Sequence, residues 1–340
     1  MRPAPHLPPG SSDRGAATRA PRRRGGWRWE TLLGAATLMV FIVNALLSPY
    51  FLSATTLSDA SFNFTEKALV ALPMALLVIA KEIDISVAAI MALASVAMGY
   101  GAMAGWDTPA VALLGVAVGV VCGTCNGLLV TALRVPSIVA TIGTMSLFRG
   151  IAYGILGDRV MKHYPAGFDY FGQGYVIGTL SFELVLFAAA ALITGLVLHA
   201  TIFGRRLYAI GTNPTTARMS GIAVDRYRLA LFMITGAASG LASVLLTSRL
   251  GSTRPSLAVG WELEIISMVI LGGVSVSGGR GTIVGVVLAA VLLGLVTFGL
   301  SLQNIPGIVL SIVVGALLIV IVALPVIGAR WAAARAARSE

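Results

Sequence analysis

One uncharged stretch, PAVALLGVAVGVVCGTCNGLLVTA (residues 109–132), decides the fold class of this chain. A helix of this length is long enough to cross the hydrocarbon core of a membrane, which takes about 20 apolar residues. Its glycines recur at every fourth position, so they lie on one helix face and predict close packing against another helix. These glycines are Gly115, Gly119, Gly123 and Gly127. A flexible gate is the alternative role for them.

The remainder of the chain has the same apolar character. Of its 340 residues, 57% are hydrophobic and only 11% are charged, with a mean hydropathy of +0.91. A soluble domain carries about 25% charged residues, so this composition excludes most soluble enzymes. The net charge of +10 comes mainly from arginines, and no basic face alternates with aromatic residues as a nucleic-acid groove requires. We therefore expect a lipid bilayer around the chain and no nucleic-acid partner.

Ten apolar segments predict an all-α, polytopic transmembrane helical bundle of about ten spans. Two of the segments contain a helix breaker, Pro73 or Gly272, and are candidates for broken or re-entrant spans. The ten segments are residues 31–52, 61–80, 87–105, 109–132, 137–156, 181–201, 228–248, 262–278, 282–301 and 305–327.

The distribution of arginine and lysine predicts the orientation of the bundle. Threading ten spans with the N-terminus inside places most basic residues in cytoplasmic segments, as membrane proteins require. Both termini are then cytoplasmic. We expect a disordered, basic cytoplasmic arm at residues 1–30, a transmembrane domain at residues 31–327 with a long cytoplasmic loop at residues 203–228, and a cytoplasmic tail at residues 328–340.

Polar side chains inside predicted spans are costly in hydrocarbon, and three of them are candidates for a function. Asn63 and Glu66 share one face of the second span, and Arg149 lies deep in the fifth. A charge near the bilayer centre costs about 2.5 to 3.5 kcal/mol on insertion scales, so Arg149 needs a partner or water. The three residues are candidates for a translocation pathway. For Arg149, a gate ion pair is a second functional possibility, and a structural ion pair or snorkelling near a misplaced span end is the alternative.

The charged segment KEIDIS (residues 81–86) connects the second and third spans. Asp84 stands just before the third span, followed closely by Ser86. A short polar side chain at this place satisfies free N–H groups at a helix start, so Asp84 is expected to cap the third span.

The long loop GRRLYAIGTNPTTARMSGIAVDRYR (residues 204–228) is partly apolar, which a solvated tether would not need. Pro214 is typical of a first helical turn and Gly221 of a helix stop. The pattern predicts a short helix over about residues 214–220 on the inner membrane surface. This helix either docks a cytosolic partner or simply lies at the interface.

A glycine-rich stretch, LGGVSVSGGRGT (residues 271–282), is similar to a phosphate-binding loop but lacks its lysine. Such a loop requires Gly-Lys followed by Ser or Thr, and the sequence contains no Gly-Lys dipeptide. Metalloprotease and serine-hydrolase motifs are also missing from the sequence. We expect no enzyme activity, no metal and no cofactor on this chain. The glycines of this stretch are Gly272, Gly273, Gly278, Gly279 and Gly281.

Three motifs in this order, IDISV (residues 83–87), GTNPTTARMSGI (residues 211–222) and LGGVSVSGGRGT, resemble the permease subunits of bacterial ABC importers of the ribose and rhamnose type. The resemblance covers about residues 60–327. The segment AKEIDISVAAIMALAS (residues 80–95) is most similar to rhamnose permeases, although many relatives carry Gly-Gly where this chain has Lys81 and Glu82. The resemblance implies a type II ABC importer-like fold in the bacterial inner membrane.

The same resemblance implies partners. They are cytosolic ATPase subunits holding ATP and Mg, a second permease copy or paralogue, and an extracytoplasmic sugar-binding protein that delivers a monosaccharide such as rhamnose or ribose. The cytoplasmic loop would dock into the ATPase, although Pro214 stands where a polar or acidic residue is more common. The residues expected to couple are Gly204, Arg205, Gly211, Asn213, Pro214, Ala217, Ser220 and Gly221.

Two other functions fit the sequence less well than an ATP-driven permease. An ATP-independent secondary transporter or channel for a small polar solute would carry several acidic residues within its spans, and only Glu66 clearly qualifies. An intramembrane enzyme would need a catalytic constellation of His, Asp or Ser at span depth, and the sequence offers none.

Overall fold

The long apolar segments fold into helices, which the computed structural model describes over residues 26–62, 64–306, 309, 312 and 315–316. A two-stranded antiparallel hairpin, β1 (Tyr175–Ile177) and β2 (Leu180–Ser181), interrupts them and was not expected from the sequence. The helices are α1 (Gly26–Leu47), α2 (Ala54–Phe62), α3 (Thr65–Ile79), α4 (Val87–Met103), α5 (Thr108–Thr131), α6 (Ser137–Leu156), α7 (Tyr170–Gln173), α8 (Phe182–Ala200), α9 (Ile202–Thr212), α10 (Pro214–Met219), α11 (Val224–Leu250), α12 (Trp261–Leu271) and α13 (Ile283–Leu302).

The prediction of ten spans is not confirmed. Within the described residues, six helices are long and apolar enough to cross a membrane, namely α1, α5, α6, α8, α11 and α13. The pair α2 and α3, bent by 49°, gives a seventh at most, while α4 and α12 have only 17 and 11 residues. The tenth predicted segment, residues 305–327, lies largely outside the described residues, as do residues 1–25 and the predicted tail.

The two predicted breaks behave differently. Pro73 lies inside the continuous helix α3, and the bend comes before α3 begins. The segment at residues 262–278 does stop early, because α12 ends in a Schellman motif. Gly273, at a φ of +83°, donates its N–H to Ile270, and Val274 donates to Val269. Hydropathy alone does not detect this reversal of the backbone.

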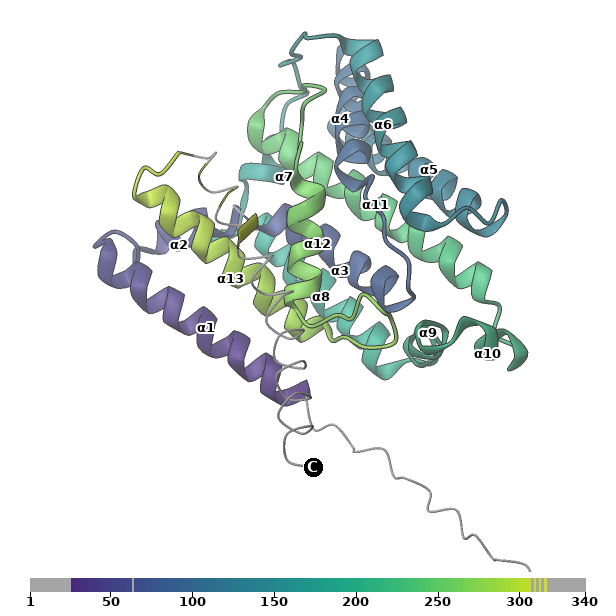
Figure 1. The fold of residues 1–340 in the computed structure, drawn as a ribbon. Helices are drawn as coiled ribbons and strands as arrows, with labels where there is room; N and C mark the ends of the chain where they lie inside the picture. Colours follow the sequence, from purple (N-terminus) through teal and green to yellow (C-terminus); the bar gives the residue numbers. More distant parts are fainter. Residues whose placement is uncertain (1–25, 63, 307–308, 310–311, 313–314, 317–340) are drawn as a thin grey trace, which may run out of the picture.

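Helix α3 lies at the centre of the packing. Nearly every residue of α3 is buried, and α8, α11, α12 and α13 all pack against it. Helix α1 packs on α13 at one edge, whereas α4, α5 and α6 gather with α11 on the opposite side (Figure 1). Displacing α3 would therefore disturb the helices on both sides of it.

Helices α5 and α11 touch through their backbones. A Cβ added to Gly119 would collide with the carbonyl oxygen of Gly236, and the reverse substitution would collide equally. Only glycine permits such an approach. The glycines that α5 places on this side are Gly115, Gly119, Gly123 and Gly127.

Different elements of the fold lie at the two ends of the bundle. At the α9–α10 end, α3 and α12 finish, while α11 and α13 begin. At the hairpin end, β1 and β2 contact α2 and α8, the start of α3 lies beside the start of α8, and the finish of α11 packs against α7.

Candidate functional site

Two of the sequence motifs, GTNPTTARMSGI and LGGVSVSGGRGT, meet the end of α3 at the α9–α10 end of the bundle. We call this meeting point the junction, formed by residues 79–81 at the end of α3, residues 208–212 of α9, and residues 278–281 of the glycine loop that follows α12. These segments are far apart in the sequence, yet their backbones are in contact.

Main-chain contacts hold the junction together. The N–H of Gly279 donates to the carbonyl of Ile79 at 2.9 Å, and the hydroxyl of Tyr208 donates to the carbonyl of Gly281 at 2.6 Å. Burial raises the pKa of the Tyr208 hydroxyl, which keeps this donor protonated. Gly211 leaves no free space, because an added Cβ would collide with both the Ile79 oxygen and the Gly279 nitrogen.

Lys81 closes α3 in a conformation that glycine normally provides. Its φ is +68°, its N–H donates to Val78 at 2.9 Å, and the N–H of Glu82 donates to Leu77 at 3.0 Å. This is the Schellman pattern of a helix end, with lysine at the left-handed position. The Nζ of Lys81 reaches the carbonyl of Thr212 at 3.3 Å, so this residue also joins α3 to α9.

Asp84 does not cap the following helix, contrary to the prediction. The residue at the cap position of α4 is Ser86, which makes no side-chain capping bond. Instead, Asp84 accepts hydrogen bonds from the Ser86 N–H at 2.8 Å, the Ser86 hydroxyl at 2.6 Å and the Asn126 amide at 3.1 Å. Asp84 stands two residues before Ser86, where its carboxylate closes a local turn and fastens it to α5.

The predicted short helix corresponds to α10. The side-chain oxygen of Asn213 accepts hydrogen bonds from the N–H groups of Thr215 and Thr216, both at 3.1 Å, and Pro214 occupies the first helical position. Beyond the helix, Gly221 adopts a φ of +79°. Asn213 and Gly221 thus bound α10 in the way that their residue types favour.

Helix α10 exposes one large apolar side chain. Ala217 is buried against the neighbouring helices, but the side chain of Met219 is 84% exposed. Arg205 and Ser220 are exposed as well. Gly204 makes the tight corner after α8, where a Cβ would collide with the backbone of Leu198.

Charged pairs occupy the hairpin end. Glu66, fully buried in α3, accepts a hydrogen bond from Nε of Arg249 at 2.7 Å. The next residue, Lys67, pairs with Glu264 at 2.5 Å and lies 4.6 Å from the ring centre of Trp261. Arg249 directly follows the predicted span at residues 228–248, and its pairing with Glu66 was missed because the two residues are 183 positions apart in the sequence. The signal that could have predicted the pair is that Glu66, near the start of one apolar segment, and Arg249, just after another, carry opposite charges.

The other pathway candidates have different surroundings. Arg149 donates to the backbone carbonyls of Pro255 and Leu257, at 2.8 and 2.7 Å, and so fastens α6 to the loop before α12. Asn63 lies outside the described residues. Glu183, which sequence reasoning did not single out, is fully buried beside Glu66, and its carboxyl oxygens have no hydrogen-bond partner within the described ranges.

Comparison with known proteins identifies the family. Residues 56–322 match the family described as the permease component of branched-chain amino acid transport systems. The chain belongs to this permease family. It is 34% identical over 300 residues to the autoinducer 2 import system permease protein LsrD of Escherichia coli K12 and equally to that of Shigella flexneri, covering 86% of this chain and 91% of each relative. No solved structure matches the chain significantly.

This permease membership confirms the resemblance to permease subunits of ABC importers, which are transport components rather than enzymes. Together with the six apolar helices of spanning length, it identifies a multi-pass membrane protein. The names of the relatives refer to autoinducer 2 and to branched-chain amino acids, so rhamnose and ribose remain predictions.

Proposed function

We propose that this permease is the membrane-spanning subunit of an ATP-driven importer in the bacterial inner membrane. It would translocate a monosaccharide, rhamnose or ribose-like, by alternating access. In this arrangement the α9–α10 end and both termini face the cytoplasm, and the hairpin end faces outward. The membership of the permease family supports transport, and the excess of arginine around α9 and α10 supports the orientation.

The junction is the observation that carries the proposal. Helix α10 follows α9 directly, and α9 contacts α3 and the glycine loop through Gly211, where no side chain intervenes. Because backbone contacts have no rotamers to absorb a displacement, a push on α10 would move the end of α3. Helix α3 is central, so the displacement would reach the helices packed around it.

The partners in this proposal supply what the chain lacks. Cytosolic ATPase subunits would bind ATP and Mg and press on α10 when they close, which tilts the helices and opens the pathway outward. A sugar-binding protein would deliver the substrate at the hairpin end, and a second permease copy or paralogue would complete the pathway. ATP hydrolysis would take place entirely on the ATPase subunits, and this chain would take no part in the chemistry.

Capture of the complex tests the ATPase partnership. The tagged chain is purified from its native membrane in mild detergent, and co-purifying proteins are identified by mass spectrometry. We expect a P-loop ATPase with the unaltered chain and with Val259→Glu, an exposed residue of the loop before α12, but not with Met219→Glu. Recovery of the chain without any ATPase, from membranes where a control ABC complex survives, would instead favour an ATP-independent transporter.

The substrate is tested separately by uptake. Cells with and without the chain are given labelled rhamnose, ribose or autoinducer 2, the last because it appears in the names of the relatives. Loss of rhamnose or ribose uptake in cells without the chain is the expected result. If only autoinducer 2 uptake were lost, the chain would still be a permease, but its substrate would be autoinducer 2 and not rhamnose or ribose.

A further inference from the structure

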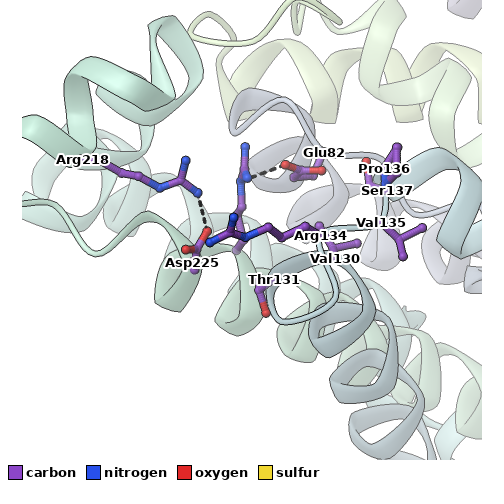
Figure 2. Close-up of a pocket in the computed structure, with 10 residues that line it drawn as sticks. Glu82, Val130, Thr131, Arg134, Val135, Pro136, Ser137, Arg218 and Asp225 are labelled. Atoms are coloured by element: carbon purple, nitrogen blue, oxygen red, sulfur yellow. Dashed lines mark hydrogen bonds and ion pairs between the residues drawn. The ribbon is translucent and has the colours of Figure 1, made fainter.

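A cavity of about 450 Å³ lies beside the junction. It is enclosed by the end of α5, the start of α6, the segment after α3, and the adjoining parts of α10 and α11, as Figure 2 shows. Most of its lining is polar, although the helices around it are apolar. Its charge and its position indicate what it could bind.

The cavity carries an excess of positive charge. Arg228 pairs with Glu82 at 2.8 Å, and Arg218 pairs with Asp225 at 2.6 Å (Figure 2). A third guanidinium, that of Arg134, also lines the cavity and forms no ion pair within the part of the chain that the structure describes. Three arginines and two carboxylates therefore leave one positive charge without a counterion.

The N-terminus of a helix adds to this positive charge. Helix α6 begins at the cavity with Pro136 at its cap position and no side-chain cap. Its free N–H groups and the positive end of its dipole therefore favour an anion there.

The segment that carries Arg134 also exposes apolar side chains. Leu133, Ile138 and Val139 flank Arg134 along the chain, and their side chains are 69%, 47% and 61% exposed. Basic pockets beside apolar transmembrane helices are suited to anionic headgroups, because acyl chains cover the apolar surface while the phosphate meets the cations.

The geometry points to a binding site for the phosphate group of an anionic lipid. The phosphate lies among Arg134, Arg218 and Arg228, whose guanidinium groups suit phosphate oxygens, and the acyl chains lie along Leu133 and Val139. Because Arg218 belongs to α10 and Arg134 to the connection between α5 and α6, one phosphate bridges these elements. Bound lipid therefore stabilises one position of α10.

Lipid binding to the purified full-length chain tests this site. Native mass spectrometry measures the binding of phosphatidylglycerol and of phosphatidylcholine to the unaltered chain, to Arg134→Asn and to Arg280→Asn. Asparagine suits position 134, where the backbone φ is +57°, so the variant adds no strain. Arg280 is an exposed arginine of the glycine loop outside the cavity and serves as the matched control.

We expect phosphatidylglycerol to bind more tightly than phosphatidylcholine, and Arg134→Asn to weaken its binding about tenfold while Arg280→Asn does not. Inorganic phosphate is added as a competitor. Free phosphate is the ligand, and the lipid assignment is wrong, if two results are obtained. Millimolar phosphate would displace the lipid from the unaltered chain but not from Arg134→Asn, and phosphate alone would stabilise the chain as much as phosphatidylglycerol does. Equal binding of both lipids, or no effect of Arg134→Asn, would overturn the site. Loss of a co-purifying ATPase in Arg134→Asn, without a change in lipid binding, would identify a protein contact instead.

Discussion

The two ends of α3 are held in opposite ways. At the hairpin end, its first turn carries Glu66 and Lys67, which pair with Arg249 and Glu264. At the α9–α10 end, its last carbonyls meet glycine backbone, as in the hydrogen bond from Gly279 to Ile79. Ion pairs can separate and form again elsewhere, but a backbone contact through glycine has no such freedom. The contrast suits a helix that is pushed at one end and rearranges at the other.

Breaking the junction should have the largest effect. Gly211→Ala places a methyl group against the Ile79 oxygen and the Gly279 nitrogen, which cannot move away as a side-chain tip could. Overpacking of this kind costs about 3 kcal/mol or more, so we expect a lower melting temperature and loss of uptake. Gly154→Ala on α6, where nothing lies within 4 Å, is the control and should change neither. Equal melting temperatures for the two variants would refute the close contact at the junction.

Breaking the ion pair at the other end should cost nearly as much. Arg249→Met leaves Glu66 as a fully buried carboxylate without its partner, and such a change costs about 3 kcal/mol. Glu264→Gln removes a partner from Lys67, a pair that is partly exposed, and should cost at most about 1 kcal/mol. Thermal unfolding of the purified variants measures both. The double variant Arg249→Met with Glu66→Gln should recover most of the loss, and failure to do so would show that packing, not charge, holds this end.

Much of the α9–α10 end could be predicted from the sequence because its signals are local. Asn213, Pro214 and Gly221 mark the limits of α10 through the backbone preferences of single residues. The contact of Gly211 with Ile79 could not be predicted, since a glycine fits a close approach equally well in many places. The pairing of Glu66 with Arg249 was missed for the same reason, because it depends on how distant helices are arranged.

The prediction of ten spans is not confirmed, and at one segment the physical reason is clear. Hydropathy measures whether a segment tolerates lipid, and the segment at residues 262–278 is uncharged after Glu264 and largely apolar. The backbone nevertheless turns after Leu271, because Gly272 and Gly273 provide a helix stop inside that segment. The helix α12 is consequently short and packs against α3. Apolar composition therefore predicted the class of fold but not the number of complete crossings.

Replacing Gly221 should separate coupling from folding. Its φ of +79° disfavours any other residue, but no atom lies within 4 Å of an added Cβ. Gly221→Leu should therefore cost about 1 to 2 kcal/mol and still insert into the membrane. If α10 transmits movement to the ATPase, the variant should lose substrate-stimulated ATPase activity in reconstituted complexes. Stimulation at the unaltered level, with normal insertion, would show that the shape of this turn is not needed for coupling.

The smallest effect is expected at Lys81, where both kinds of contact meet. Lys81→Gly relieves the left-handed backbone, worth about 1 to 2 kcal/mol, but adds chain entropy and loses the exposed hydrogen bond to Thr212. These terms nearly cancel, so the melting temperature should change little. Lys81→Val loses the same hydrogen bond and cannot adopt the left-handed conformation without strain, so it should lower stability by about 1 to 2 kcal/mol. If both variants lowered it equally, the side-chain contact with Thr212 would be what matters, and the α9–α10 end would depend on side chains as the hairpin end does.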